Sequence, residues 1–562
     1  MPTAFDGIVA ALSPGDGDAR ATKPVPLIAP ALLRLALVVT GVSAVALALL
    51  SLAWPWGPDQ AIMVHVARVW LDGGAPFKDA IDHKGPYAFV PFVVGEMVGR
   101  GSMAGIRIVD LAAIAATMAL AGRSIARLMG HTVALWTGAI ILAWCFRITY
   151  GEVAQPDEWV ALASAVLFLR RMETPGRDDG LAVWGIGVLA GIGVLVKPFY
   201  LGIAAFPLFT MLVATRETRG SLAACAVRVG LGAAIPVLAM GAHLAARGAL
   251  DDMFEIYLGA VNLAYRGAAA DRPLSYHPSG LASFFLRKSW MVPLLPLLLL
   301  GLHELRRGQA RLGVMVATWF AAGLALVVLQ GRYFAYHFFV LMPPMAILVA
   351  VALDAAGRQL PSTTPPIVRA GLRLAPALAL VYAASIASRP VRDAVAIMEE
   401  LRGGSGLVEA IRVTQLRSGL SAGYARGERL AESLAQRGQR DQEVGLFIYD
   451  PTPLLLAQVR PASRLFVISP AYTRRNAYGD SVLTSYANEL ARERPEYIVV
   501  DCWLSWESEE KSYPTVSPSF VALLARSYRL DEDVDGLRLY RARHAGDAPV
   551  APVSPDSICP RR

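Results

Sequence analysis

The sequence is poor in charged residues. They make up 17% of the 562 positions, against 55% hydrophobic residues, whereas a soluble globular domain has about 25% charged and about 45–50% apolar residues. The scarcity of charge argues against a soluble protein. The formal net charge of +8 is modest for this length. Basic residues gathered in loops would therefore reflect membrane topology and anionic lipid rather than nucleic acid, and no nucleic-acid partner is expected.

Cysteine is also scarce, and none of the four cysteines has the CxxC spacing of a zinc or redox motif. Cys145 and Cys225 lie in apolar runs, where cysteine packs as a small apolar residue. Cys502 and Cys559 could form a disulfide if the C-terminal part of the chain faced an oxidising compartment.

Motifs of cofactor sites are absent as well. The histidines show neither the HxxxH nor the HxxH spacing of a helix-borne zinc pair, and no GxGxxG or P-loop motif accompanies the short β-rich runs near the C-terminus. The sequence therefore indicates no cofactor. A divalent cation held by His83 with Asp79 and Asp82 is an alternative to simple hydrogen bonding of that histidine.

Long hydrophobic runs are what the sequence has instead. A helix needs about 20 mostly apolar residues to cross a bilayer, and we predict an α-helical polytopic membrane protein with about eleven transmembrane helices. The predicted spans are residues 32–54, 105–122, 130–147, 156–171, 181–197, 198–214, 222–246, 289–303, 310–330, 336–355 and 370–388. The first run is longer than the apolar region of a cleaved signal peptide, which has about 7–15 residues. It is predicted to be a retained signal anchor after a disordered cytoplasmic tail at residues 1–30.

The arginine distribution predicts which loops face outward. The run 87–98 is short, follows Pro86 and contains Glu96. If it does not cross the membrane, nearly all arginine clusters fall on the cytoplasmic side, as the positive-inside rule requires. We therefore expect an interfacial or re-entrant helix at 87–98. The transmembrane domain would cover 31–389, with periplasmic loops at 55–104 and 247–288.

The chain beyond residue 389 is more charged, and its apolar runs shorten to strand length. We expect helices over 391–436, 480–494 and 517–527, between strands at 444–449, 464–468 and 497–501, with 537–540 as a final edge strand. Strands that alternate with helices predict a periplasmic α/β domain at 390–544 with a mainly parallel sheet. Residues 545–562 are expected to be a disordered tail.

Chemistry-bearing residues are densest in the first periplasmic loop. Asp59 lies about one turn beyond the first span, at the membrane surface, and Asp82, His83 and Lys84 follow in the same loop. An acid at this depth could act on a lipid headgroup. It could equally cap the helix that begins there, and spacing alone leaves both roles open.

This loop resembles the first periplasmic loop of GT-C glycosyltransferases, in the bacterial family related to protein O-mannosyltransferases and lipid A aminoarabinose transferases. The resemblance lies in an aromatic-rich end of the first span, then Asp59, an amphipathic helix, a Gly-Gly-x-Pro turn and the run through His83-Lys84-Gly85-Pro86. It implies that Asp59 is the general base and that Lys84 contacts the carrier phosphate. The family often has Asp-Glu where this chain has Asp59-Gln60. The resemblance covers residues from about 30 to 390, and the Trp-Trp-Asp signature of oligosaccharyltransferases is absent.

The same family places an acid at the start of the fourth span, facing the first-loop acid. Asp157 and Glu158 both match that position. The alternative is again helix capping, because Pro-Asp-Glu is a common first helical turn whose acids suit the helix dipole.

Basic and aromatic residues on the same side are candidate partners of a phosphate or a sugar. The candidates are Lys197, Arg266 and Arg332, with Tyr333 and His337 in an aromatic turn that resembles one in the family. Any single one of these residues could simply snorkel to the interface. The tryptophans Trp54 and Trp56 could line a sugar site, but an interfacial aromatic belt is the interpretation we favour.

The resemblance implies an inverting glycosyltransferase of the cell inner membrane. It would move a hexosyl or pentosyl group from a polyprenyl-phosphate-linked donor to a lipid, glycan or protein acceptor of the cell envelope. A transporter or lipid flippase is the alternative, although its usual internal repeat is not visible. A third hypothesis is a non-catalytic membrane scaffold that uses the C-terminal α/β domain for binding.

Overall fold

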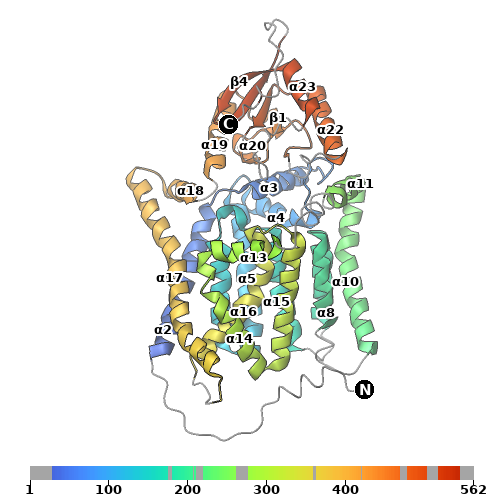
Figure 1. Ribbon diagram of the computed structural model, residues 1–562. Helices are drawn as coiled ribbons and strands as arrows, with labels where there is room; N and C mark the ends of the chain where they lie inside the picture. Colours follow the sequence, from blue (N-terminus) through green and yellow to red (C-terminus); the bar gives the residue numbers. More distant parts are fainter. Residues whose placement is uncertain are drawn as a thin grey trace.

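The computed structural model describes residues 28–174, 180–206, 208–209, 219–260, 276–358, 363–418, 421–468, 477–502, 517–544 and Ile558. Several predicted features lie outside these residues: Arg266, Cys559, most of the N-terminal tail, and residues 207 and 210–214 of the span predicted at 198–214. Figure 1 shows a tall bundle of helices with a smaller sheet-containing domain above it.

The helices of the bundle follow the apolar runs of the sequence. They are α2 (Ile28–Leu50), α5 (Ala104–Met129), α6 (His131–Arg147), α7 (Pro156–Glu173), α8 (Gly180–Val194), α10 (Arg219–Ala246), α14 (Leu294–Gly308), α15 (Ala310–Gln330), α16 (Met342–Ala356) and α17 (Pro366–Arg402). Within the described residues, six helices are long and apolar enough to cross a membrane. A seventh span results if α13 (Tyr276–Arg287) and the helix after it, bent by 87°, are counted as one. The predicted polytopic helical architecture is confirmed, and the number of spans stays a prediction.

Two short helices lie between the bundle and the upper domain (Figure 1). They are α3 (Pro58–Leu71) and α4 (Val90–Gly99). The ten residues of α4 are too few to cross a bilayer. Its Glu96 is buried and accepts a 2.8 Å hydrogen bond from Arg68 Nε of α3. This ion pair fastens the two helices to each other above the bundle.

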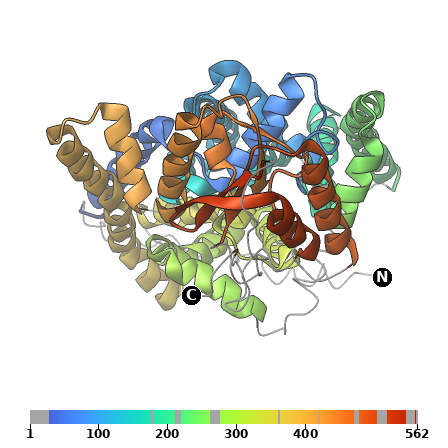
Figure 2. The ribbon, with the colours of Figure 1, turned by 90° about the horizontal axis from the view of Figure 1, so that it is seen from above.

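The C-terminal domain contains one five-stranded sheet in the order β2-β1-β3-β5-β4. Its strands are β1 (Glu443–Phe447), β2 (Arg460–Pro461), β3 (Tyr497–Asp501), β4 (Tyr528–Val534) and β5 (Leu537–Ala542). The helices of this part are α18 (Leu407–Ser418), α19 (Ser421–Gln436), α20 (Thr452–Ala457), α22 (Ala477–Glu493) and α23 (Pro518–Ser527). Figure 2, seen from above, shows α19, α22 and α23 beside the sheet, whereas α18 lies next to the end of α17 (Figure 1).

The α/β domain is confirmed, but its sheet is mixed rather than mainly parallel. β2, β1 and β3 are parallel, whereas β5 pairs antiparallel with both β3 and β4. The predicted final edge strand, β5, is therefore internal, and the edge is β4. The acidic sequence Leu-Asp-Glu-Asp hid β4, although the Asp535-Gly536 turn that follows is a typical hairpin signal with positive φ at both residues. The strand predicted at 464–468 is also displaced, because β2 occupies Arg460–Pro461.

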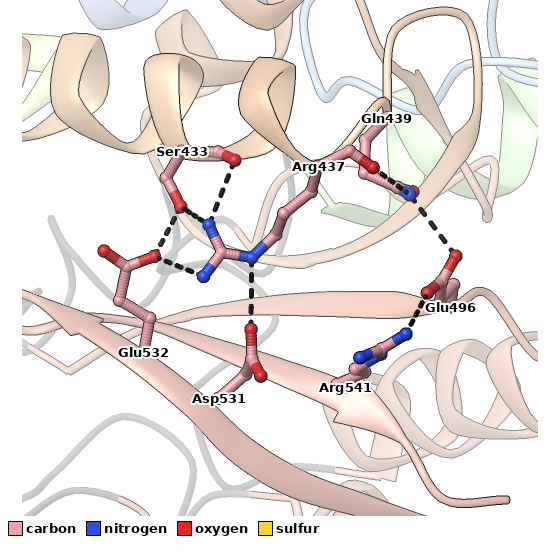
Figure 3. A network of polar contacts seen from close by, with 7 residues as sticks. All are labelled: Ser433, Arg437, Gln439, Glu496, Asp531, Glu532 and Arg541. Atoms are coloured by element: carbon pink, nitrogen blue, oxygen red, sulfur yellow. Dashed lines mark hydrogen bonds and ion pairs between the residues drawn. The ribbon is translucent and has the colours of Figure 1, made fainter.

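Helix α19 is held against the edge of this sheet by a charged network (Figure 3). Arg437 Nε lies 3.1 Å from Asp531 Oδ2, and its Nη2 lies 3.0 Å from Glu532 Oε2, both on β4. The Ser433 hydroxyl donates to the same Glu532 carboxylate. The charges that disguised β4 in the sequence are thus the groups that dock it.

Helix α17 runs from the far end of the bundle to the base of the C-terminal domain (Figure 1). Its Arg389 donates to the carbonyl oxygens of Phe146, Arg147 and Ile148 at 3.1, 2.9 and 2.6 Å. The last carbonyls of a helix have no partner within that helix. Arg389 therefore caps α6 and joins the two helices where the upper domain begins.

The tryptophans after the first span do not form an interfacial belt, and that prediction was wrong. Trp54 has no exposed surface, and Trp56 is 3% exposed. The guanidinium groups of Arg389 and Arg107 lie 5.0 and 5.9 Å from the Trp54 ring centroid. Two cations from distant helices thus hold this ring inside the protein.

The end of the chain contacts the sheet at one described point. Ile558, within the segment predicted to be a disordered tail, is fully buried. Its carbonyl oxygen accepts hydrogen bonds from Arg538 at 2.8 Å and Tyr540 at 3.2 Å. Nearby, Cys502 is disulfide-bonded, whereas Cys145 and Cys225 are free.

Candidate functional site

Asp59 lies in the first turn of α3, whose start is set by an extended Gly57 followed by Pro58. The N-terminal cap is provided by Gln60, whose Oε1 accepts the Gly57 N–H at 2.9 Å. The Asp59 carboxylate instead faces Lys84, with Oδ1 3.6 Å from Nζ. Tyr449 Oη, from the C-terminal domain, donates to the same oxygen at 3.4 Å. Asp59 is thus directed at its neighbours rather than at its own helix.

Gln60, where the family often has a second acid, serves a structural role. Its amide donates to the carbonyls of Tyr150 and Val153 at 3.0 and 2.5 Å, which ties the first loop to the second. Its Oε1 also accepts a hydrogen bond of 2.9 Å from Nη2 of the buried Arg107. Position 60 therefore points into the protein, and the site has a single carboxylate from this helix.

Lys84 is shared between two acids. Its Nζ lies 3.4 Å from Asp82 Oδ2 in addition to its contact with Asp59, and its side chain is 9% exposed. His83 Nδ1 lies 3.0 Å from Asp82 Oδ1, and the His83 backbone N–H donates to that oxygen at 2.8 Å. Burial alone would raise the pKa of Asp82, but Lys84 and His83 outweigh it and hold this pKa well below the usual range. Asp82 therefore stays ionised and anchors Lys84.

A close backbone approach brings this loop to the Lys197 segment. Gly85 and Tyr87 donate backbone hydrogen bonds to the carbonyls of Val196 and Leu195 at 3.3 and 3.2 Å. A Cβ atom on Gly85 would lie 2.0 Å from the Leu195 oxygen, so only glycine fits. Lys84 and Lys197 therefore lie on two adjoining segments of the chain.

Lys197 and Asp157 form a buried ion pair. Lys197 Nζ lies 2.8 and 2.7 Å from the two Asp157 oxygens and 3.1 Å from Gln330 Oε1. The Tyr200 hydroxyl donates to Asp157. Lys197 Nζ also lies 5.3 Å from the Tyr336 ring centroid. This Lys197 cluster joins three elements that are far apart in the sequence.

Glu158, the residue after Asp157 in the first turn of α7, points away from Lys197. It is fully buried and accepts the Ala154 N–H at 2.9 Å. The indole N–H of its neighbour Trp159 donates a hydrogen bond of 2.9 Å to the buried Asp110. Of the two candidates, only Asp157 pairs with a site lysine, Lys197, whereas Glu158 binds the backbone of the loop before α7.

The turn after α15 is placed only partly as predicted. His337 is buried, bonds through Nδ1 to the Arg332 carbonyl oxygen, and has its ring 4.6 Å from that of Tyr336. His337 thus borders the Lys197 cluster. Tyr333 instead pairs with His277, at 2.7 Å between Oη and Nδ1. Tyr336, which the sequence analysis missed, occupies the place expected for Tyr333.

The C-terminal domain contributes residues that the sequence analysis also missed. Tyr449 and Asp450 follow β1 at its carboxyl end, the edge at which parallel sheets usually bind ligands. Asp450 Oδ1 accepts hydrogen bonds from the Thr452 N–H at 2.9 Å and from its hydroxyl at 2.5 Å. Burial raises the pKa of Asp450; the bonds from Thr452 and the charge of Arg426 oppose this rise, and the charge of Asp59 adds to it.

An apolar cavity of about 390 Å³ adjoins the Lys197 cluster at Tyr200. It lies between α7, α15 and the turns at Pro198–Ala204 and Ala335–Leu341, and Phe168, Phe206 and Trp319 are among its lining residues. No group of three or more His, Cys, Asp or Glu side chains that could hold a metal occurs in the described ranges. The arrangement thus offers two lysines, one directed carboxylate and an apolar groove.

Comparison with known proteins gives a fold. No protein-family model matches the chain, and no curated protein matches it. The crystal structure of ArnT from Cupriavidus metallidurans bound to undecaprenyl phosphate is similar, with a TM-score of 0.54 and 15% identity over 93% of this chain and 99% of that chain. The apo structure of the same ArnT gives a TM-score of 0.53 and 15% identity over 91% and 97%. The chain therefore has the fold of ArnT over nearly its whole length, which confirms the GT-C fold that its first loop predicts.

Proposed function

We propose that the protein is an inverting glycosyltransferase that moves a sugar from a polyprenyl-phosphate donor to a hydroxyl-bearing acceptor of the cell envelope. The observation that carries the proposal is the position of Lys84, held between Asp59 and Asp82 beside the Lys197 segment. The ArnT structure of the same fold contains undecaprenyl phosphate. A cation and a directed carboxylate at one place are the two groups that transfer from a phosphate donor needs.

Lys84 would bind the donor phosphate. Its contact with Asp59, at 3.6 Å, is longer than a good charge-assisted hydrogen bond of about 2.7–2.9 Å. A phosphate oxygen can therefore replace Asp59 as a partner of Lys84 while Asp82 keeps the lysine in place. Donor binding would in this way release the Asp59 carboxylate at the moment it is needed.

Asp59 would act as the general base. It accepts the proton of the acceptor hydroxyl as that oxygen attacks the anomeric carbon. The bond from the anomeric carbon to the phosphate oxygen breaks, and the polyprenyl phosphate leaves with the electron pair, stabilised by Lys84. One displacement of this kind inverts the anomeric configuration.

The remaining predicted residues would hold the donor. The Asp157–Lys197 pair is bonded to Tyr200, which lines the apolar cavity, and the walls of this cavity suit a polyprenyl chain. His337 lies beside Tyr336 at the edge of the Lys197 cluster. Arg332 and Arg266 are proposed as further phosphate partners because they are basic residues on the predicted outer side of the membrane. In this scheme Glu158 supports the loop and does not contact substrate.

The reaction would take place at the periplasmic face of the inner membrane. The disulfide at Cys502 supports this placement of the C-terminal domain, because disulfides persist in oxidising compartments. The arginine distribution of the bundle agrees with it.

The test is mass spectrometry of envelope glycans and lipids from cells with and without the protein, followed by reconstitution with the lipid-linked sugar that accumulates without it. Transfer to an acceptor with release of polyprenyl phosphate is the expected result. Movement of the intact lipid-linked sugar across proteoliposomes without chemical change would instead establish a flippase.

A further inference from the structure

A second cavity, of about 400 Å³ and lined by both charged and apolar side chains, lies far from the proposed active site. Helices α5, α14 and α16 end around it, at Met129, Gly308 and Ala356. This is the end of the bundle where α17 begins, away from the C-terminal domain (Figure 1). The site is therefore independent of the glycosyl-transfer chemistry proposed above.

The charged residues that line the cavity are balanced: Glu304 and Asp354 against Arg307 and Arg358. The Asp354 side chain is 15% exposed and pairs with Arg358, whose side chain is 68% exposed. The guanidinium of Arg307 is exposed and donates to Thr364 Oγ1 at 3.1 Å. The acids thus lie within the cavity and the arginines at its rim.

Glu304 indicates which chemical group would bind in the inner part of the cavity. Its Oε1 is buried and has no hydrogen-bond partner among the residues that the structure describes. A buried carboxylate oxygen without a donor is costly. Three helix C-termini around the same space add partial negative charge. A group with several N–H donors and a positive charge, such as a primary ammonium, satisfies both conditions.

The rim requires the opposite charge. An exposed arginine presents N–H donors that suit a phosphate group. A purely cationic ligand would meet Arg307 and Arg358, and a purely anionic one would meet Glu304 and Asp354. Only a ligand that carries both charges matches the whole cavity.

We propose that this cavity binds a phosphoethanolamine headgroup, with the ammonium on Glu304 and the phosphate on the rim arginines. The volume falls in the range of small-molecule sites, about 300–1,000 Å³. On the same helix α14, Leu299 is 74% exposed toward the surroundings of the bundle. Acyl chains could lie along that surface, so phosphatidylethanolamine of the adjacent leaflet is one source of the headgroup and soluble phosphoethanolamine is the other.

The test is native mass spectrometry of the purified full-length protein with phosphatidylethanolamine, phosphatidylcholine and phosphatidylglycerol of identical acyl chains. For the first lipid molecule bound per protein, we expect phosphatidylethanolamine to bind at least about 10-fold more tightly than either other lipid. The reason is that choline has no N–H donor and glycerol has no positive charge. Glu304→Gln should remove this preference, and Arg358→Gln should weaken phosphatidylethanolamine binding. Displacement by soluble phosphoethanolamine would show that the headgroup suffices, and failure of displacement would identify the lipid as the ligand.

The control is Glu173→Gln, which removes a negative charge near Arg127 and Arg170 without lining the cavity. This variant should keep the lipid preference of the wild type. Equal binding of the three lipids by the wild type would overturn the proposal. So would a Glu304→Gln protein, monodisperse and folded, that still prefers phosphatidylethanolamine.

Discussion

The hydroxyl of Tyr449 donates a hydrogen bond to the carboxylate of Asp59, although 390 positions separate the two residues in the chain. Tyr449 follows strand β1 of the upper domain, and Asp59 begins α3 above the bundle. The upper domain therefore reaches the proposed base directly and is part of the site.

Removing this hydroxyl should slow transfer without affecting the donor. Tyr449→Phe loses one hydrogen bond to a charged group, worth about 1.5–3 kcal/mol at most, so kcat should fall by roughly 10-fold while polyprenyl-phosphate binding is unchanged. Tyr497→Phe, in β3 of the same domain, is the matched control and should keep full activity. An unchanged kcat in Tyr449→Phe would show that the contact does not position Asp59.

Replacement of Asp59 should abolish chemistry while sparing the fold. Asp59→Asn keeps the shape but removes the proton acceptor, and general-base catalysis contributes about 10²–10⁴-fold. Sugar transfer in reconstituted vesicles measures this loss. Asp72→Asn, at the exposed end of the same helix, removes only a surface ion pair with Arg100 and should stay active. Retained turnover in Asp59→Asn rejects the assignment of the base.

Lys84 should be required for donor binding. Lys84→Met removes the cation that would meet the phosphate, and the affinity for polyprenyl phosphate should fall by about 10–100-fold, measured by native mass spectrometry. Lys78→Met, an exposed lysine of the same loop that contacts the Arg247 carbonyl, is the control. If both variants bind alike, the phosphate lies elsewhere.

The buried Asp157–Lys197 pair predicts a stability cycle. Lys197→Met leaves the fully buried Asp157 without its cation, which typically costs about 3–5 kcal/mol. Adding Asp157→Asn removes the stranded charge and should recover most of the loss in thermal unfolding. Transfer activity should stay low in both variants. A double variant as unstable as Lys197→Met would mean that the pair is held by other contacts.

His65 should make the protein less stable in acid. Burial and the nearby Arg68 lower its pKa from 6.5 to about 3, so between these pH values the unfolded chain binds one proton more than the folded chain. Stability therefore falls as pH decreases below 6.5, by up to about 1.4 kcal/mol per pH unit. His65 packs 4.2 Å from Phe466 of the upper domain, so the loss should appear as weaker docking of that domain.

The check is the unfolding temperature between pH 7.5 and 4.5. His65→Leu should flatten the pH dependence relative to the wild type. The exposed His544→Leu should leave the dependence unchanged. Parallel curves for the wild type and His65→Leu would contradict a neutral buried histidine.

Local patterns predicted the parts of the site that are local. The first-loop motif identified Asp59 and Lys84, which lie 3.6 Å apart, and the acid and lysine of two further loops form the Asp157–Lys197 pair. The pairing itself could not be foreseen, because it depends on how α7 packs against the turn after α8. Tyr449 was hidden for the same reason, since nothing near it in sequence indicates that β1 ends above Asp59.

The errors have physical causes too. Trp54 was expected at the lipid interface because it follows an apolar span, yet Arg107 and Arg389 arrive from distant helices and bury it. Strand β4 was missed because its acids pair with Arg437, which directly follows α19, rather than facing solvent. In both cases a tertiary ion contact overrode the usual meaning of a local pattern.

The hydrophobic core of the upper part extends across the predicted domain boundary at residue 389. Ile62 and Val66 of α3 and Phe92 of α4 belong to the same buried cluster as Phe447 and Val499 of the sheet. Any chimera with a relative of this fold must therefore exchange α3, α4 and the sheet as one block. A graft of the C-terminal segment alone would meet a mismatched surface and would be expected to aggregate or to be degraded, however well its own strands pair.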